Sequence, residues 1–187
     1  MKRSNLAIAL SLAAVLPFAA QAQEAPSNTW VEGSYVNADG NAEGHAVRGS
    51  FEFGESNVYG LAGVTRLDVE DSPLVLDGRE LGLGYAHPLS DRTDLFAEAA
   101  YRDVEVQVPG GAVDSDGYRT SVGLRSGLTD RVEGLVKANY VDGDNIDGDF
   151  SGTVGGLVKL TPTWGITGDV TFGDDAETYQ LGVRASF

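Results

Sequence analysis

Apolar and polar residues alternate with a period of two along most of the chain, and the C-terminal segment shows the pattern in its clearest form. Every second residue there is apolar up to the final phenylalanine, at Tyr179, Leu181, Val183, Ala185 and Phe187. The positions between them hold Gln180, Gly182, Arg184 and Ser186. Side chains of a β-strand point alternately to its two faces, so this pattern predicts a strand with one apolar and one polar face.

The same alternation recurs in ten segments, at 29–36, 45–53, 58–67, 79–87, 94–105, 117–127, 132–141, 150–160, 163–172 and 179–187. Helix-forming residues nowhere recur with a helical period. The sequence therefore predicts an all-β protein with ten strands. If the count is eight, the segments to omit are 150–160 and 163–172, which are joined across Thr161 and Pro162.

The connections between these segments are of two alternating kinds. Short turns are expected at 54–57, 88–92, 129–131 and 161–162. Connections that are mostly longer and rich in Asp, Glu and Gly are expected at 37–44, 68–78, 106–116, 142–149 and 173–176. This asymmetry is typical of bacterial outer-membrane barrels, whose short turns lie in the periplasm. An even number of strands then places both chain termini in the periplasm.

Charged residues of both signs gather on the polar face of the predicted strands, while the other face is nearly free of charge through the strand middles. In a closed barrel the polar face is the lumen, where opposite charges can pair, and a closed sheet leaves no backbone edge unsatisfied in lipid. The pattern predicts a closed antiparallel up-and-down transmembrane β-barrel. The predicted lumen charges, with a slight basic excess, are Glu32, Arg48, Glu52, Arg66, Glu80, Glu98, Arg102, Arg119, Arg125, Glu133, Lys137, Lys159, Asp169 and Arg184.

Aromatic residues on the apolar face concentrate at the strand ends, which favours a membrane barrel over a soluble sheet. The ends near the longer connections carry Tyr35, Tyr101, Tyr118, Tyr140, Phe172 and Tyr179. The ends near the short turns carry Phe53, Tyr59, Tyr85, Trp164 and Phe187. Two aromatic girdles at two lipid–water interfaces are what a membrane-spanning barrel needs.

The first residues have the organisation of a secretory signal peptide. Lys2 and Arg3 precede an uncharged apolar stretch over residues 6–20, and Ala20-Gln21-Ala22 gives the small-x-small pattern of a cleavage site. A transmembrane anchor is the weaker interpretation, because the apolar run is short and Pro17 interrupts it. We expect residues 1–22 to be removed and residues 23–187 to form one barrel domain, with a short disordered segment at about 23–28.

The charge balance and the absence of cysteine exclude several classes of protein. The chain has 13 basic and 28 acidic residues, and its formal net charge of −15 becomes −17 once the signal peptide takes Lys2 and Arg3 with it. Such acidity argues against nucleic acid as a partner. Without cysteine, neither a disulfide scaffold nor a lipoprotein anchor is available.

The chain resembles the small outer-membrane β-barrel family of Gram-negative bacteria, which includes OmpX and the transmembrane domain of OmpA. The closing strand from Tyr179 to Phe187 is similar to the C-terminal signal that the barrel-assembly machinery recognises, and the hairpin from Leu81 to Tyr101 also reads like this group. The sequence further resembles a subfamily of small barrels that has been called a quorum-signalling factor. The best-known members have eight strands, so the ten counted here are a departure.

Candidate catalytic residues are few, and an enzyme is not expected. Hydrolase sites usually need a histidine beside a serine or a carboxylate. Only His45 and His87 are present. His87 adjoins Pro88 in a predicted turn, and the position of His45 in its strand directs it toward lipid, with no serine at a matching height.

A metal site is a weak hypothesis, and no cofactor is expected. Four carboxylates fall within eight residues, at Asp142, Asp144, Asp147 and Asp149. Hard cations such as Ca²⁺ favour clustered carboxylate oxygens, but the spacing is not that of a calcium loop and the closing glutamate is missing. A solvated acidic loop is the favoured interpretation. The alternative is that the acidic connections hold divalent cations that bridge to lipopolysaccharide phosphates.

The sequence favours a monomeric, non-enzymatic barrel with a structural or surface-interaction role, in contact with outer-membrane lipid and lipopolysaccharide. A barrel of about this size is nearly filled by its own side chains, which favours a closed interior of ion pairs. A narrow solute or ion channel is the alternative. The acidic connections at its mouth would enrich cations, whereas the basic excess inside would oppose their passage. An outer-membrane enzyme is a third, less favoured class.

Overall fold

Ten antiparallel strands make up the computed structural model, which describes residues 26–39, 41–54, 56–144, 146–173 and 177–187. The predicted signal peptide lies outside the described residues. The strands are β1 (Trp30–Ala38), β2 (Ala42–Glu52), β3 (Val58–Val69), β4 (Val75–Ser90), β5 (Thr93–Val108), β6 (Gly111–Thr129), β7 (Val132–Gly143), β8 (Ile146–Lys159), β9 (Trp164–Gly173) and β10 (Glu177–Ser186).

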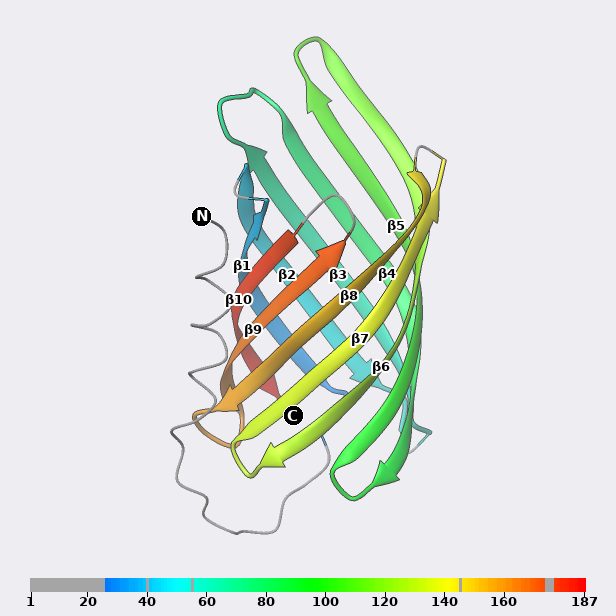
Figure 1. The fold of residues 1–187 in the computed structure, drawn as a ribbon, viewed down its shortest axis with the longest axis vertical. Coiled ribbons are helices and arrows are strands. Elements are labelled where there is room, and N and C mark those ends of the chain that lie inside the picture. The colour runs from blue at the N-terminus through cyan, green and yellow to red at the C-terminus, as the bar shows by residue number, and fades with distance from the viewer. Residues whose placement is uncertain (1–25, 40, 55, 145, 174–176) are drawn as a thin grey trace.

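Each strand pairs with its two sequence neighbours, and β1 pairs with β10 to close the barrel (Figure 1). The closing pair runs without a register shift from Trp30 opposite Ser186 to Ala38 opposite Thr178. The predicted all-β, ten-stranded closed barrel is therefore confirmed, and the eight-stranded alternative is wrong. Within the described part of the chain, no helix is long and apolar enough to cross a membrane.

The two ends of the barrel differ. One, which we call the turn end, carries the short turns β2–β3, β4–β5, β6–β7 and β8–β9, and there the Ser27 hydroxyl donates a hydrogen bond of 2.8 Å to the carbonyl of Phe187. The other, which we call the hairpin end, carries the remaining connections. The β3–β4 and β5–β6 hairpins project far beyond the rest of the barrel at the top of Figure 1.

The predicted long connection at 106–116 is wrong, because most of it continues the strands. The β5–β6 ladder extends to the pair Val108 and Gly111, and the positive φ of 101° at Gly110 allows the tight turn between them. The predicted connection at 142–149 is shortened in the same way, since β7 ends at Gly143 and β8 begins at Ile146. The alternation of apolar and polar residues did not identify these extensions. They contain many polar residues, because a strand that projects beyond the lipid does not need an apolar face.

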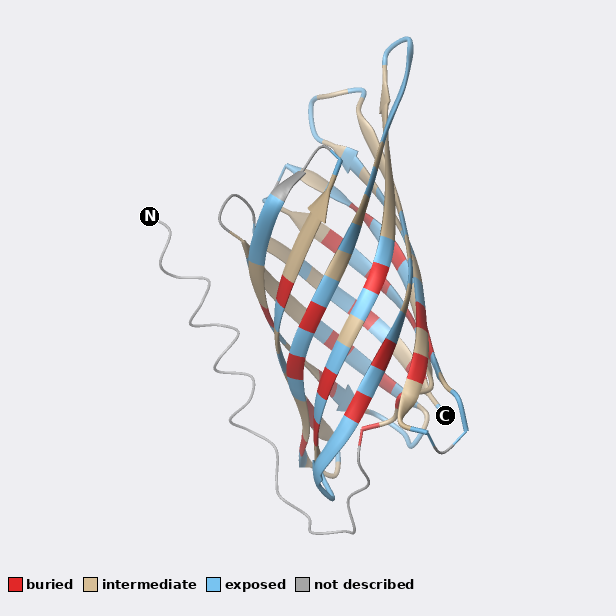
Figure 2. Ribbon diagram, turned by 90° about the vertical axis from the view of Figure 1, so that its right-hand side faces the viewer, coloured by how far each residue is buried: buried red, intermediate tan, exposed pale blue. Residues whose placement is uncertain are grey.

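Side-chain burial alternates along the strands, with apolar residues on the exposed outer face and polar ones inside. Leu81 and Leu181 are 69% and 64% exposed on the outer wall, whereas Glu32 on the inner wall is 1% exposed. The alternating red and blue bands in Figure 2 follow this pattern around the barrel. An apolar outer band around a polar interior is typical of transmembrane barrels and the reverse of a soluble protein.

Strand β3 has the opposite orientation to the one predicted. Gly63 lies opposite Arg48, so the face of β3 that carries Tyr59 lines the lumen. Arg66 lies opposite His45 and points outward, where its Nη1 is 3.4 Å from a carboxylate oxygen of Asp77. The prediction of Arg66 as a lumen charge and of Tyr59 as a girdle residue was therefore wrong. The segment has small or apolar residues at most positions of both faces, so alternation alone could not orient it.

Candidate functional site: the barrel lumen

A buried carboxylate ties three strands together inside the barrel. The Glu32 side chain is fully buried and accepts hydrogen bonds from Arg48 Nη2 at 2.5 Å and Arg184 Nε at 2.9 Å. Arg48 Nη2 is also 3.2 Å from Asp169. The Arg184 guanidinium lies 4.1 Å above the ring of Trp30. Each charge here has an opposite partner, which offsets the cost of removing it from water.

A second ion-pair cluster links β4, β5 and β6. Arg119 Nη2 is 2.6 Å from Glu80, and Arg119 Nη1 is 3.2 Å from Glu98. The Tyr59 hydroxyl donates to Glu98 at 3.0 Å. Arg102 is held more loosely, with its Nε 3.8 Å from Glu80.

Neutral polar side chains extend this cluster around the wall. Arg119 donates to the Ser121 hydroxyl, which donates to Asn139 at 2.8 Å. Asn139 in turn donates to Thr153 at 3.0 Å, and the hydroxyls of Thr153 and Thr171 are 2.9 Å apart. Four adjacent strands, β6 to β9, are thus joined by side-chain hydrogen bonds inside the lumen.

The N-terminal residues 26–29, which we call the strap, reach into the turn end of the lumen. Asn28 is 8% exposed. Its side-chain amide donates a hydrogen bond to Glu52 at 3.2 Å, and its backbone carbonyl accepts one from the Ser50 hydroxyl at 2.6 Å. Arg125 donates to the Asn28 side chain at 2.5 Å and lies 3.6 Å from Asp94. The predicted disorder is therefore wrong for residues 26–28, while residues 23–25 lie outside the described part of the chain.

The lumen holds balanced charge. It contains thirteen of the fourteen predicted residues, all but Arg66, and also Asp94, which the prediction missed although it shares a strand face with Glu98. Lys159 completes the pairing at the turn end, 2.7 Å from Glu133. The predicted basic excess is replaced by seven basic residues and seven acidic ones. The basic ones are Arg48, Arg102, Arg119, Arg125, Lys137, Lys159 and Arg184, and the acidic ones are Glu32, Glu52, Glu80, Asp94, Glu98, Glu133 and Asp169.

An apolar cluster also lies inside the barrel. Its buried members are Tyr59, Leu61, Ala86, Phe96 and Ala100, and Leu135 packs against them. The ring of Tyr59 occupies the space where a Cβ of Gly84 would stand. Glycine is needed at residue 84 because the tyrosine ring approaches the β4 backbone so closely. Period-two alternation gave no sign of this cluster, because it assigned Tyr59 to the outer face.

The turn-end half of the lumen is filled more completely than the hairpin-end half. In that half each of the ten strands has a buried inward side chain or glycine, which for β1 is Asn28, just before the strand. The buried bands in Figure 2 do not extend into the projecting hairpins. These positions are Asn28, Ser50, Tyr59, Ala86, Phe96, Gly123, Glu133, Leu157, Thr167 and Gly182. Inward side chains are therefore packed more closely toward the turn end, although Tyr59, Glu133 and Leu157 also line the cavity described next.

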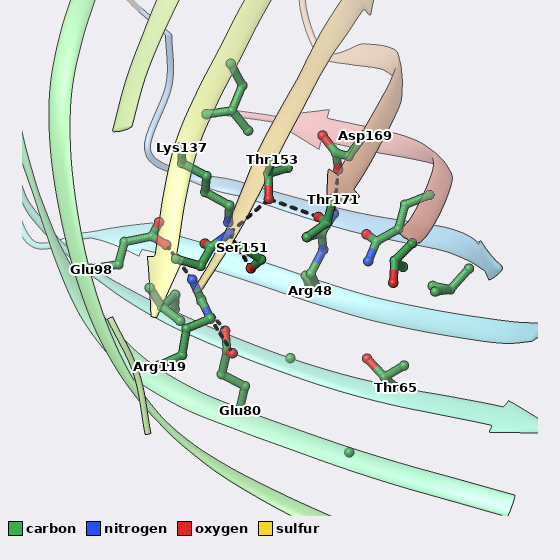
Figure 3. Close-up of a pocket in the computed structure, with 18 of the residues that line it drawn as sticks. Arg48, Thr65, Glu80, Glu98, Arg119, Lys137, Ser151, Thr153, Asp169 and Thr171 are labelled. Carbon is green, nitrogen blue, oxygen red and sulfur yellow. Dashed lines mark hydrogen bonds and ion pairs between the residues drawn. The ribbon is translucent and has the colours of Figure 1, made fainter. Parts of the chain in front are cut away.

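A cavity of about 500 Å³ remains inside the lumen. Its walls reach from Arg125 and Glu133 near the turn end to Leu76 and Thr178 near the hairpin end. Its polar lining includes Arg48, Glu98, Lys137 and Asp169, from strands on different sides of the barrel (Figure 3). A volume of this size is in the range of small-molecule sites.

Comparison with known proteins places this architecture among solved outer-membrane barrels. No family model and no curated protein matches the sequence. The KdgM porin has a TM-score of 0.54 with 14% identity over 84% of this chain and 99% of its own, and a KdgM complex with disordered oligogalacturonate has 0.52. The NanC porin has 0.54 with 9% identity over 85% of this chain and all of its own. The barrel is similar in fold to these porins.

The outer surface of this porin-like barrel carries the two aromatic belts that were predicted, without Tyr59. At the hairpin end, tyrosine hydroxyls donate to outward carboxylates, from Tyr118 to Asp142 at 2.9 Å and from Tyr179 to Glu177 at 2.8 Å. Tyr35 donates to Glu43 in the same manner. These pairs mark the level at which the wall changes from apolar to acidic.

The remaining candidate residues do not form a chemical site among the described residues. His45 packs edge-on against Tyr35 at 5.9 Å and His87 stacks on Tyr85 at 6.4 Å, both on the outer wall. Asp142 accepts hydrogen bonds from Tyr118 and Tyr140, whereas the side chain of Asp147 lies outside the described part. No group of three or more metal-ligating side chains occurs within the residues that the structure describes.

Proposed function

We propose that this chain is an integral, monomeric protein of the bacterial outer membrane with a structural and surface-interaction role, without enzymatic activity. The observation that carries the proposal is the close packing at the turn end of the lumen, where Asn28, Ser50 and Asp94 are all buried and do not line the cavity. A barrel that conducted solutes continuously would leave such inward groups exposed to water. The apolar outer wall and the fold similarity to porins support the membrane location.

The proposed orientation places the turn end and both termini in the periplasm. Short turns on one side and longer projections on the other are the arrangement of bacterial barrels. The projecting β3–β4 and β5–β6 hairpins then extend outside the cell, where they are available for surface contacts. A narrow channel is the second candidate, which the 500 Å³ cavity and the similarity to the KdgM and NanC porins favour.

Planar-bilayer recording separates these two candidates. We expect the purified protein to give no stable unitary conductance, and we expect Arg125→Ala to give frequent openings, because Arg125 holds the strap through Ser27 and Asn28. Arg92→Ala, at an exposed turn position, is the control and should remain silent. Stable conductance from the unaltered protein would establish the channel instead.

The proposal includes delivery by the barrel-assembly machinery through the closing strand, with Tyr179, Leu181, Val183, Ala185 and Phe187 as its apolar signal. Phe187 is 75% exposed and its side chain packs into no core. We therefore expect Phe187→Ala to reduce the amount of protein assembled in the outer membrane severalfold, without changing refolding of the purified chain into detergent. Phe51→Ala, another exposed outward phenylalanine, is the matched control. Equal loss in both variants would contradict a role as a signal.

The acidic surface at the hairpin end is proposed to contact lipopolysaccharide through divalent cations. Outward carboxylates stand just above the tyrosine belt, where lipid phosphates would lie, and two like charges need a cation between them. We expect saturable Ca²⁺ binding in calorimetry that Asp142→Asn weakens and Asp91→Asn, at the turn end, leaves unchanged. Absence of saturable heat would remove this part of the proposal.

A further inference from the structure

The lumen contains basic side chains whose hydrogen-bonding capacity is not used. Lys137 lines the cavity, and among the described residues it has no ion pair within 4 Å and no hydrogen bond. Lys159, the other lumen lysine, shows the contrast, since its Nζ lies 2.7 Å from Glu133. An ammonium group in a narrow lumen has three donors, and it is costly to leave them without acceptors.

Two arginines on the cavity wall are also incompletely paired. Arg102 is 36% exposed, and its one ion pair in the described structure joins Nε to Glu80 at 3.8 Å, which leaves its outer nitrogens available. Arg48 makes both of its ion pairs through Nη2, while its buried Nε has no hydrogen-bond partner. The total lumen charge is balanced, but the incompletely paired charges that line the cavity are basic. Glu52, a lumen carboxylate without an ion pair in the described structure, contacts Asn28 and does not line the cavity.

Lys137, Arg48 and Arg102 all line the same cavity. Arg48 comes from β2 and Lys137 from β7, which lie five strands apart in either direction around the ring. They therefore approach the cavity from opposite walls, and Figure 3 shows both side chains reaching into it. An anion between them would be contacted from two sides, which favours binding over a site on one wall.

The rest of the lining suits a hydroxylated molecule. Thr65, Ser151, Thr153 and Thr171 present hydroxyl groups to the cavity. Gln180 lines it too. Such a lining offers donors and acceptors for several hydroxyls in addition to the basic groups for one negative charge.

We propose that the central cavity of the lumen is a binding site for a small hydroxylated carboxylate of monosaccharide size. Lys137 and Arg48 hold the carboxylate, with Arg102 raising the positive potential at the entrance. The hydroxyl and amide side chains of the wall contact the sugar ring. The cavity, which has about 500 Å³ over its whole length, is large enough for such a ligand. The site is entered from the hairpin end, so it does not require the barrel to conduct.

Calorimetry with D-glucuronate and D-glucose tests the site, because these probes share a ring and differ in the carboxylate. The full mature protein is used in detergent micelles at low salt. We expect saturable binding of glucuronate, and binding of glucose that is at least about tenfold weaker, since one charge-assisted interaction contributes roughly that factor. Equal affinity for the two sugars, or no saturable heat with glucuronate, overturns the proposal.

Lys137→Gln is the decisive variant, and it should weaken glucuronate binding about tenfold. Arg92→Gln removes one positive charge at an exposed turn and should leave affinity unchanged, which controls for net charge. Heat-modifiable gel mobility shows whether each variant is folded. Unchanged affinity in folded Lys137→Gln overturns the proposal, and so does inorganic phosphate that binds as tightly as glucuronate. Because the readout is binding, a negative result here leaves the bilayer test of the closed lumen unaffected.

Discussion

Glu32→Gln is expected to lower the free energy of unfolding by about 3–5 kcal/mol, the cost of leaving buried charges without a partner. The Glu32 side chain is fully buried and forms ion pairs with both Arg48 and Arg184. Glutamine has the same shape, so the substitution removes the charge and keeps the packing. Urea unfolding in detergent micelles, followed by gel mobility, measures the difference.

The matched control for this variant is Glu43→Gln. Glu43 is an exposed carboxylate on the outer wall, and its contact is with the hydroxyl of Tyr35. Exposed charge interactions contribute little, so its free energy of unfolding should be nearly unchanged. If Glu32→Gln were as stable as the unaltered protein, the central ion pairs would not hold the barrel together.

Gly84→Val is expected to lower the free energy of unfolding by about 2–3 kcal/mol through steric overlap. The Tyr59 ring occupies the place of the new side chain, and it is fixed there by its hydrogen bond to Glu98 and its contacts in the apolar cluster. The ring therefore cannot move aside without breaking other contacts. The same unfolding assay measures this variant.

A double-variant cycle shows whether the overlap is the cause. Tyr59→Ala removes the ring, so Gly84→Val should cost much less in that background, with a coupling energy of about 1 kcal/mol or more. Gly33→Ala is the control, because a Cβ at Gly33 meets nothing within 4 Å. Additive effects of the two substitutions would mean that Gly84 matters for a reason other than Tyr59.

Several features of the site could be predicted because one strand face carries charge and the other does not. Glu32, Glu98 and Arg119 sit in segments with unbroken alternation, and alternation assigns each of them to the polar face. Asp94, the first residue of segment 94–105, follows the same rule, and applying the alternation to the start of that segment would have placed it with Glu98. Arg66 and Tyr59 could not be oriented, because the small and apolar residues of β3 fit either face.

The strap and the cavity could not be predicted at all. Asn28 precedes the first alternating segment, and its position depends on Arg125 and Glu52, which are distant in sequence and are brought close by barrel closure. The free donors of Lys137 also depend on geometry, since seven acidic residues would suffice to pair seven basic ones. Only the positions of the side chains around the ring determine which of them meet.

The sequence by itself determined the all-β class, the ten strands and the charged interior, because side-chain direction in a strand depends only on residue parity. The tertiary structure alone decided the orientation of β3, the length of the hairpins and the way the lumen is filled. These depend on hydrogen-bond register and on contacts across the ring, such as those of Arg48 and Arg125. Parity is local, whereas register and closure join residues that are far apart in the chain, so no local pattern could encode them.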